Sequence, residues 1–352
     1  MLPDWLSSPH LGPSEVDGLP RGGLSTPVLR RHPALTAEAK ECLDGSITKS
    51  TRNRYDQNIS KWKHYCEKND IADPTSAGVN NIVNYLSSLF KSGLALNTVS
   101  AHRSAISSFH CFVDGAPIGQ HHLVAKCVRG IRKFKPPTPR YAATWDVGCV
   151  LDLLAGSRYN PNSEIPFIRL KHKTAMLILI STACRQSVLT RLQCAPDYLV
   201  LRGDHYVLHP SGWDKNSRST HKVHPFLIFD HPERPEISPF LCLKAYLSRA
   251  PAQDSNFETV PLFLSDFKNF QVSLDELRKW LSSIMGAAGV PDHFKVHSVR
   301  GAVTSKAASV LPTAAIMEAV DWKSEDVFRK FYLRNIGSSV VENRRAFQAA
   351  IL

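Results

Sequence analysis

Five side chains in the second half of the chain have the chemistry needed to cleave a phosphodiester. They are Arg185, Trp322 and Tyr332, together with the two ends of the run His297-Ser-Val-Arg300. Two arginines can clamp one phosphate, and a histidine can move protons near neutral pH. A tyrosine can act as a nucleophile. The set predicts an active site in which a phenol oxygen attacks a phosphodiester.

Each of these residues also has an ordinary structural explanation. Arg185 follows the apolar run 175–180 and would need a partner there, which a salt bridge could supply as well as a phosphate. The spacing of His297 and Arg300 places both on one face of a helix, but chance often produces His-x-x-Arg. Packing in a hydrophobic core is the alternative for Trp322 and Tyr332. The order and spacing of the whole set, rather than any one member, favours the active site.

This order of residues resembles that of the tyrosine recombinase (phage integrase) family. A finer similarity, to the recombinases of DIRS-like and Ngaro-like retrotransposons, rests on three runs: Pro136-Pro-Thr-Pro-Arg-Tyr-Ala-Ala-Thr-Trp-Asp-Val147, Ala101-His-Arg-Ser-Ala-Ile106 and Phe328-Arg-Lys-Phe-Tyr-Leu-Arg334. The resemblance covers roughly residues 47–352.

The resemblance implies a role for each residue. Tyr332 would form a 3′-phosphotyrosyl bond, while Arg185 and Arg300 hold the non-bridging oxygens of the phosphate. His297 would exchange a proton with the phenol oxygen. Trp322 stands where many relatives have a second histidine, and its single N–H could bind the phosphate or its ring could pack the site.

The resemblance also implies a lysine in a β-hairpin between Arg185 and His297. Lys215 fits by position and would protonate the leaving 5′ oxygen, with Lys222 as the alternative. The sequence departs from the family in two places. Val188 stands where relatives often have an acidic residue, and ten residues rather than nine separate Trp322 from Tyr332.

Composition favours a polyanionic partner. Lys and Arg total 43 against 31 acidic residues, a net charge of +12, which fits double-stranded DNA although a merely basic protein is the alternative. The eight cysteines lack metal-ligand spacing, and reduced thiols are expected.

No cofactor, metal, small-molecule substrate or membrane partner is expected. The expected location is the nucleus in a eukaryote and otherwise the cytoplasm.

The chain is expected to be mainly α (α+β). Residues 1–46, rich in Pro, Gly and Ser, predict a disordered tail. Residues 47–135 predict a four-helix, SAM-like DNA-binding domain, with helical spacing of Tyr55, Ile59, Trp62 and Cys66 in its first helix, capped by Ser50 or Thr51. A linker is expected at 136–143. A catalytic domain follows at 144–352.

Within that domain the period of apolar residues changes along the chain. Helices are expected from Thr144, over 172–183, 239–248, 274–287, 298–308 and 313–320. Three short strands are expected at 198–201, 205–208 and 223–228, with a turn at Arg202-Gly-Asp204. They predict a small antiparallel sheet.

A basic stretch from Lys126 to Arg140 contains no acidic residue, and its prolines exclude a continuous helix. We interpret it as linker, and the two flanking DNA-binding domains favour contact with phosphates over a simple solvated surface. Its DNA-binding candidates are Lys126, Arg129, Arg132, Lys133, Lys135 and Arg140.

The resemblance implies a site-specific recombinase or integrase that acts as a homotetramer on DNA, in the integration of a mobile element. Three alternatives stay open. They are a tyrosine-type topoisomerase acting as a monomer, a domesticated DNA-binding protein with impaired catalysis, and an interaction module that retains only the fold.

Overall fold

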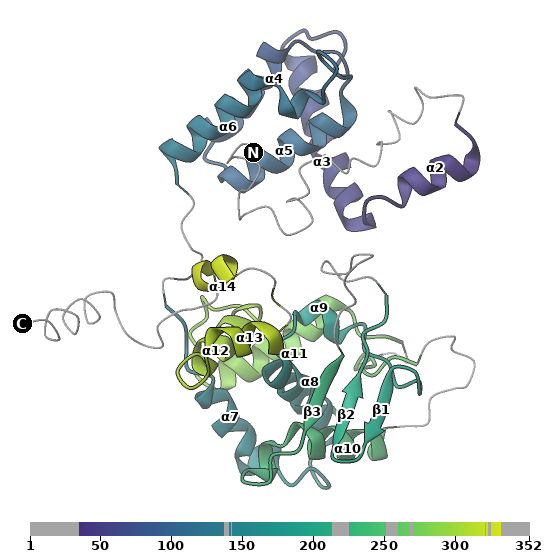
Figure 1. The fold of residues 1–352 in the computed structure, drawn as a ribbon, viewed down its shortest axis with the longest axis vertical. Helices are drawn as coiled ribbons and strands as arrows, with labels where there is room; N and C mark the ends of the chain where they lie inside the picture. Colours follow the sequence, from purple (N-terminus) through teal and green to yellow (C-terminus); the bar gives the residue numbers. More distant parts are fainter. Residues whose placement is uncertain are drawn as a thin grey trace, which may run out of the picture. The chain divides into compact units, whose positions relative to one another are not determined.

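The chain forms two compact units, residues 1–138 and 139–352 (Figure 1). The computed structural model describes residues 35–136, 141, 143–212, 225–250, 260–267, 270–320, 322 and 325–331. The boundary between the units falls within the linker predicted at 136–143. Among the described helices, none combines the length and apolar character needed to cross a bilayer.

The first unit is helical. Its main elements are α2 (Ala37–Asp44), α3 (Lys49–Lys68), α4 (Val79–Lys91), α5 (Leu96–Phe109) and α6 (His122–Phe134). Helix α3 packs against α5, and α4 against α6. The core is built around the fully buried Trp62, whose indole N–H donates to the Pro74 carbonyl at 2.9 Å. Gly93 ends the turn after α4 at φ +89°, a conformation that glycine adopts without strain.

Helix α2 lies inside the stretch predicted to be disordered, so that prediction is wrong for residues 37–44. The Thr36 hydroxyl caps the helix by accepting from the Ala39 N–H at 3.2 Å. The cap of α3 is Thr48, which accepts from the Thr51 N–H at 3.3 Å, and is not Ser50 or Thr51. Residues 1–34 lie outside the described residues.

The basic stretch is mostly helix rather than linker. Lys126, Arg129, Arg132 and Lys133 all lie on α6, which ends at Phe134, and Lys135 follows it. The three prolines begin only at 136, so they end the helix without disturbing it. Val124, Val128 and Ile131 bury the opposite side of α6.

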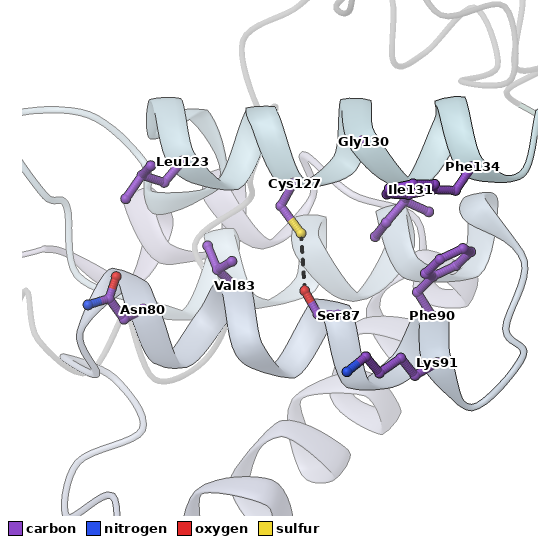
Figure 2. Close-up of a pocket in the computed structure, with 10 residues that line it drawn as sticks. All are labelled: Asn80, Val83, Ser87, Phe90, Lys91, Leu123, Cys127, Gly130, Ile131 and Phe134. Carbon is purple, nitrogen blue, oxygen red and sulfur yellow. Dashed lines mark hydrogen bonds between the residues drawn. The ribbon is translucent and has the colours of Figure 1, made fainter.

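A groove of about 570 Å³ runs between α4 and α6 (Figure 2). Val83, Phe90, Ile131 and the exposed Phe134 give it an apolar lining. The Ser87 hydroxyl and the Cys127 thiol face each other across it at 3.5 Å. Helix α6 therefore has an apolar surface that lines this groove and a basic surface formed by its Lys and Arg side chains.

The second unit surrounds α8 (Phe167–Thr182), which is buried along most of its length. The other helices are α7 (Gly148–Ala155), α9 (Gln186–Leu189), α10 (Pro239–Arg249), α11 (Leu274–Ala287), α12 (Ser298–Ala307), α13 (Thr313–Ala319) and α14 (Glu325–Phe331). Helices α10, α11 and α12 all contact α8. Helix α7 begins at Gly148, four residues later than Thr144, and its N-cap is Val147. Just before the helix, the Asp146 carboxylate accepts from the Gly148 N–H at 2.9 Å.

Two lysines of α8 are buried, and each ammonium group has polar partners. Lys173 donates to the Tyr159 carbonyl and to the side-chain oxygens of Asn160 and Asn162, at 2.8–2.9 Å. Lys171 pairs with Asp266 at 2.6 Å. Buried charges need such partners, so these contacts fix the segments around residues 160 and 266 to α8.

The antiparallel sheet has the order β1 (Leu199–Arg202), β2 (His205–Leu208), β3 (Phe226–Phe229). Gly203, at φ +58°, forms the tight turn predicted between the first two strands. In the register Leu199 pairs with Leu208 and Leu208 with Phe226. The third strand begins three residues later than predicted.

The first unit should lose stability in acid through His102. Burial, and secondarily Lys61, lowers the pKa of His102 to about 4, and Tyr85 Oη lies 2.9 Å from its Nδ1. In the unfolded chain the pKa is about 6.5. The unfolded state therefore binds more protons between these values, and stability falls as the pH drops from about 6.5 to about 4, by roughly 2–3 kcal/mol.

Urea unfolding across this pH range would measure the loss, and His102→Gln is the control because an amide can accept from Tyr85 without titrating. An equally steep decline in His102→Gln would contradict the assignment.

Candidate functional site

Arg185 lies in a sharp turn at the carboxyl end of α8. Helix α8 ends at Thr182, and Ala183 then adopts the left-handed conformation at φ 45°, ψ 26°. Arg185 is extended, half-buried, and directly precedes α9. Its carbonyl accepts from the N–H of Val188, whose side chain is buried. This turn fixes the direction of the Arg185 backbone.

Arg300 ties α12 to the same turn. Its guanidinium is buried, and Nη1 donates to the carbonyl of Ala183, two residues before Arg185. Nη2 donates to the carbonyl of Val320 at the end of α13, at 3.4 Å. The structure therefore brings the first arginine's turn and the second arginine together, as the phosphate clamp requires.

Trp322 covers the guanidinium of Arg300. The Arg300 Cζ lies 4.5 Å from the centroid of the indole, a cation–π contact. The indole also contacts Phe328 of α14, with ring centroids 4.9 Å apart. The backbone N–H of Trp322 donates to the Met317 carbonyl at 2.9 Å. Of the two roles expected from the sequence, this placement favours packing of the site.

His297 is exposed and directly precedes α12. It has helical backbone angles, so the spacing to Arg300 is that of one helical turn, as expected. The two side chains differ in burial, since Arg300 is buried among carbonyls while His297 faces outward. An exposed imidazole can exchange protons with a substrate that binds over it.

Tyr141 is a neighbour of His297 that its residue type alone did not indicate. Its hydroxyl lies 3.3 Å from His297 Nε2. Further along the same segment, the Trp145 N–H donates to the Ser298 hydroxyl at 2.9 Å. Both residues belong to the run from Pro136 to Val147 noted for its resemblance. That run was the signal that could have found them.

The loop between β2 and β3 begins beside the segment that follows Arg185. Arg191 and Ser211 form three hydrogen bonds, including the Ser211 hydroxyl to the Arg191 carbonyl at 2.8 Å and Arg191 Nη1 to the Ser211 carbonyl at 3.0 Å. Lys215 and Lys222 both follow in this loop but lie outside the described residues.

Tyr332 also lies outside the described residues, as does Arg140. Tyr332 follows Phe331, the last residue of α14. That helix contacts Trp322 through the buried Phe328, and Trp322 contacts Arg300. The described chain therefore links the second arginine to the element that ends just before the predicted nucleophile.

The predicted DNA-binding residues of α6 share an exposed surface. Lys126, Arg129 and Lys133 are exposed and recur at intervals of three and four residues, while Arg132 is half-buried. Lys135 is exposed just beyond the helix. Within the described parts of the chain, no group of three His, Cys, Asp or Glu side chains is placed to hold a metal ion.

No known protein-family model matches the chain, and no curated protein is similar to it in sequence. Solved structures are similar. XerH site-specific recombinase, in a post-cleavage complex with palindromic difH substrate, has a TM-score of 0.57 at 13% identity over 93% of this chain and 87% of its own.

Two integrases give similar results. The Tn1549 transposon integrase, in complex with transposon right end DNA, has a TM-score of 0.52 at 12% identity over 94% of this chain and 99% of its own. A lambda integrase tetramer bound to a Holliday junction has a TM-score of 0.53 at 14% identity over 83% and 74%. This chain has the fold of the tyrosine recombinases.

The contacts of the Trp322 ring with Arg300 and Phe328 should stabilise the second unit. Trp322→Leu removes the aromatic faces that contact Arg300 and Phe328, and should lower the free energy of unfolding by roughly 1–3 kcal/mol. Trp322→Phe keeps an aromatic face and should lose less than half of that. Chemical unfolding of the full chain would measure both, with Phe267→Leu as a control at an exposed position. Equal losses in the two Trp322 variants would show that the indole N–H matters instead.

Proposed function

We propose that this protein is a site-specific DNA recombinase or integrase that breaks and rejoins DNA through a phosphotyrosyl intermediate. The observation on which this rests most is the contact of Arg300 with Ala183, which joins the His297–Arg300 helix to the Arg185 turn. The shared fold adds support, because structures similar to this one are recombinases described in complex with DNA.

In the proposed reaction the Tyr332 phenol oxygen attacks phosphorus and the bond to the 5′ oxygen breaks. Arg185 and Arg300 stabilise the negative charge that grows on the non-bridging oxygens, a task for which the planar guanidinium is well suited. His297 exchanges the phenol proton, and Lys215 protonates the leaving 5′ oxygen. The 5′ hydroxyl of a partner strand then attacks the phosphotyrosine and releases Tyr332.

The assembly we propose is a homotetramer on two DNA sites, serving the integration of a mobile element. The tetramer of lambda integrase on a Holliday junction supports the assembly, and the Tn1549 integrase supports the role in an element. The DIRS-like affinity rests on the three sequence runs described above. In a eukaryotic host the site of action would be the nucleus.

One observation favours a second candidate, a DNA-binding protein with impaired catalysis. Val188 is buried at the position where relatives often have an acidic residue. A single assay separates the two functions, because covalent attachment to DNA requires an active nucleophile and binding does not.

Tyr332→Phe should abolish covalent attachment to a nicked duplex while leaving DNA affinity within about twofold, because the change removes one oxygen and little contact area. The assay traps the adduct on denaturing gels and is run in EDTA, since the two arginines would supply the charge that a metal supplies elsewhere.

Tyr141→Phe is the matched control, because the phenol of Tyr141 lies beside His297. An adduct that persists in Tyr332→Phe and disappears in Tyr141→Phe would transfer the nucleophile to Tyr141. Absence of an adduct in the wild type would favour the impaired DNA-binding protein.

The basic side of α6 should contact the DNA backbone. Lys126→Gln, Arg129→Gln and Lys133→Gln together should weaken binding without changing site preference, and each lost phosphate contact should make the plot of log affinity against log salt shallower by about 0.9. Helix α6 should persist, because these side chains are exposed.

The control replaces Lys49, Lys61 and Lys68 of α3, which are equally exposed and remove the same charge. Affinities across a salt series, with circular dichroism to check folding, would decide the outcome. A salt slope that changes equally in both triple variants would mean that only net charge matters.

A further inference from the structure

Tyr141 contacts the exposed imidazole of His297 through both its ring and its hydroxyl. Its ring stacks on the imidazole, with centroids 5.5 Å apart and planes at 30°. Its hydroxyl lies 3.3 Å from His297 Nε2 and accepts from the backbone N–H of Lys295 at 3.2 Å. The phenol is thus fixed to the backbone two residues before His297 and contacts the imidazole from there.

The segment around Tyr141 is itself anchored along α12. The Trp145 N–H donates to the Ser298 hydroxyl in the buried interior, at 2.9 Å. The Asp146 carboxylate pairs with Lys306 near the other end of α12, at 3.3 Å. The ring of Tyr141 also packs on Phe294, with centroids 5.1 Å apart. A phenol held at so many points can in turn hold a side chain that solvent would leave mobile.

We propose that Tyr141 is a positioning residue for His297, and that it fixes the imidazole in the orientation needed for proton exchange. An exposed histidine samples several rotamers, and catalytic groups must be held to within a fraction of an ångström of their productive geometry. The stacked ring restricts χ1 and χ2 of His297, and the hydroxyl selects which ring edge faces Tyr141. This inference rests on the proposed function, because it assigns a support to one of its proton-transfer groups.

Two substitutions separate the contributions of the hydroxyl and the ring. Tyr141→Phe removes the hydrogen bond and keeps the stacking, and should slow single-turnover cleavage of a nicked duplex about tenfold, the typical effect of one hydrogen bond. Tyr141→Leu removes both and should slow cleavage further. DNA affinity should stay unchanged in both variants. Tyr198→Phe is the control, because it removes a hydroxyl from a half-buried tyrosine elsewhere in the same unit.

A spectroscopic measurement tests the contact without catalysis. Selective ¹⁵N labelling of histidine reports the protonation and hydrogen bonding of each imidazole nitrogen, and His297→Gln identifies the signals of His297. Tyr141→Phe should shift these signals in the full-length protein, whereas Tyr198→Phe should leave them in place.

The outcomes distinguish this inference from the proposed function. Slower cleavage with shifted His297 signals and unchanged DNA affinity supports it. A wild-type rate, a faster rate, or equal losses of rate and affinity in Tyr141→Phe would overturn it, as would unshifted signals. If the wild type forms no adduct, the proposed function fails, and the ¹⁵N signals alone then decide whether Tyr141 orients His297.

Discussion

The buried guanidinium of Arg300 is the constraint on which the arrangement of the second unit depends. A buried cation is costly unless it has partners, and Nη1 and Nη2 of Arg300 donate to carbonyls at helix ends. Ala183 follows the last residue of α8 and Val320 the last residue of α13, so each carbonyl lies where a helix has its partial negative charge. Arg300 therefore fixes α12 against two helix ends at once.

This arrangement explains why Ala183 adopts an unfavourable conformation. The left-handed region costs a residue with a Cβ atom roughly 1 kcal/mol. At Ala183 it ends α8 and aims the carbonyl at Arg300, and two residues later the chain extends at Arg185. The strain is offset by a charge-assisted hydrogen bond, and the position of the first arginine follows from the burial of the second.

Local patterns in the sequence predict the elements well, and contacts between distant residues explain what they missed. The bounds of α11 and β2 follow directly from apolar spacing, and Gly203 marks the turn before β2. The contacts of Arg300 with Ala183 and of Tyr141 with His297 join residues 117 and 156 positions apart, which no local period reveals. The prolines at 136, 137 and 139 exclude a helix only from their own positions onward. The prediction of a linker extended this effect to residues 126–134, which belong to α6.

Val188 shows how a departure from a family pattern can leave a site's geometry in place. The turn after Arg185 is held by the backbone hydrogen bond from the Val188 N–H, at 2.8 Å, which any side chain but proline permits. The valine side chain itself is buried in the core of the unit. A carboxylate at that position would offset part of the positive charge of Arg185, whereas valine offsets none. In the proposed site, valine therefore keeps the backbone turn but lacks the buttress that a carboxylate would give Arg185.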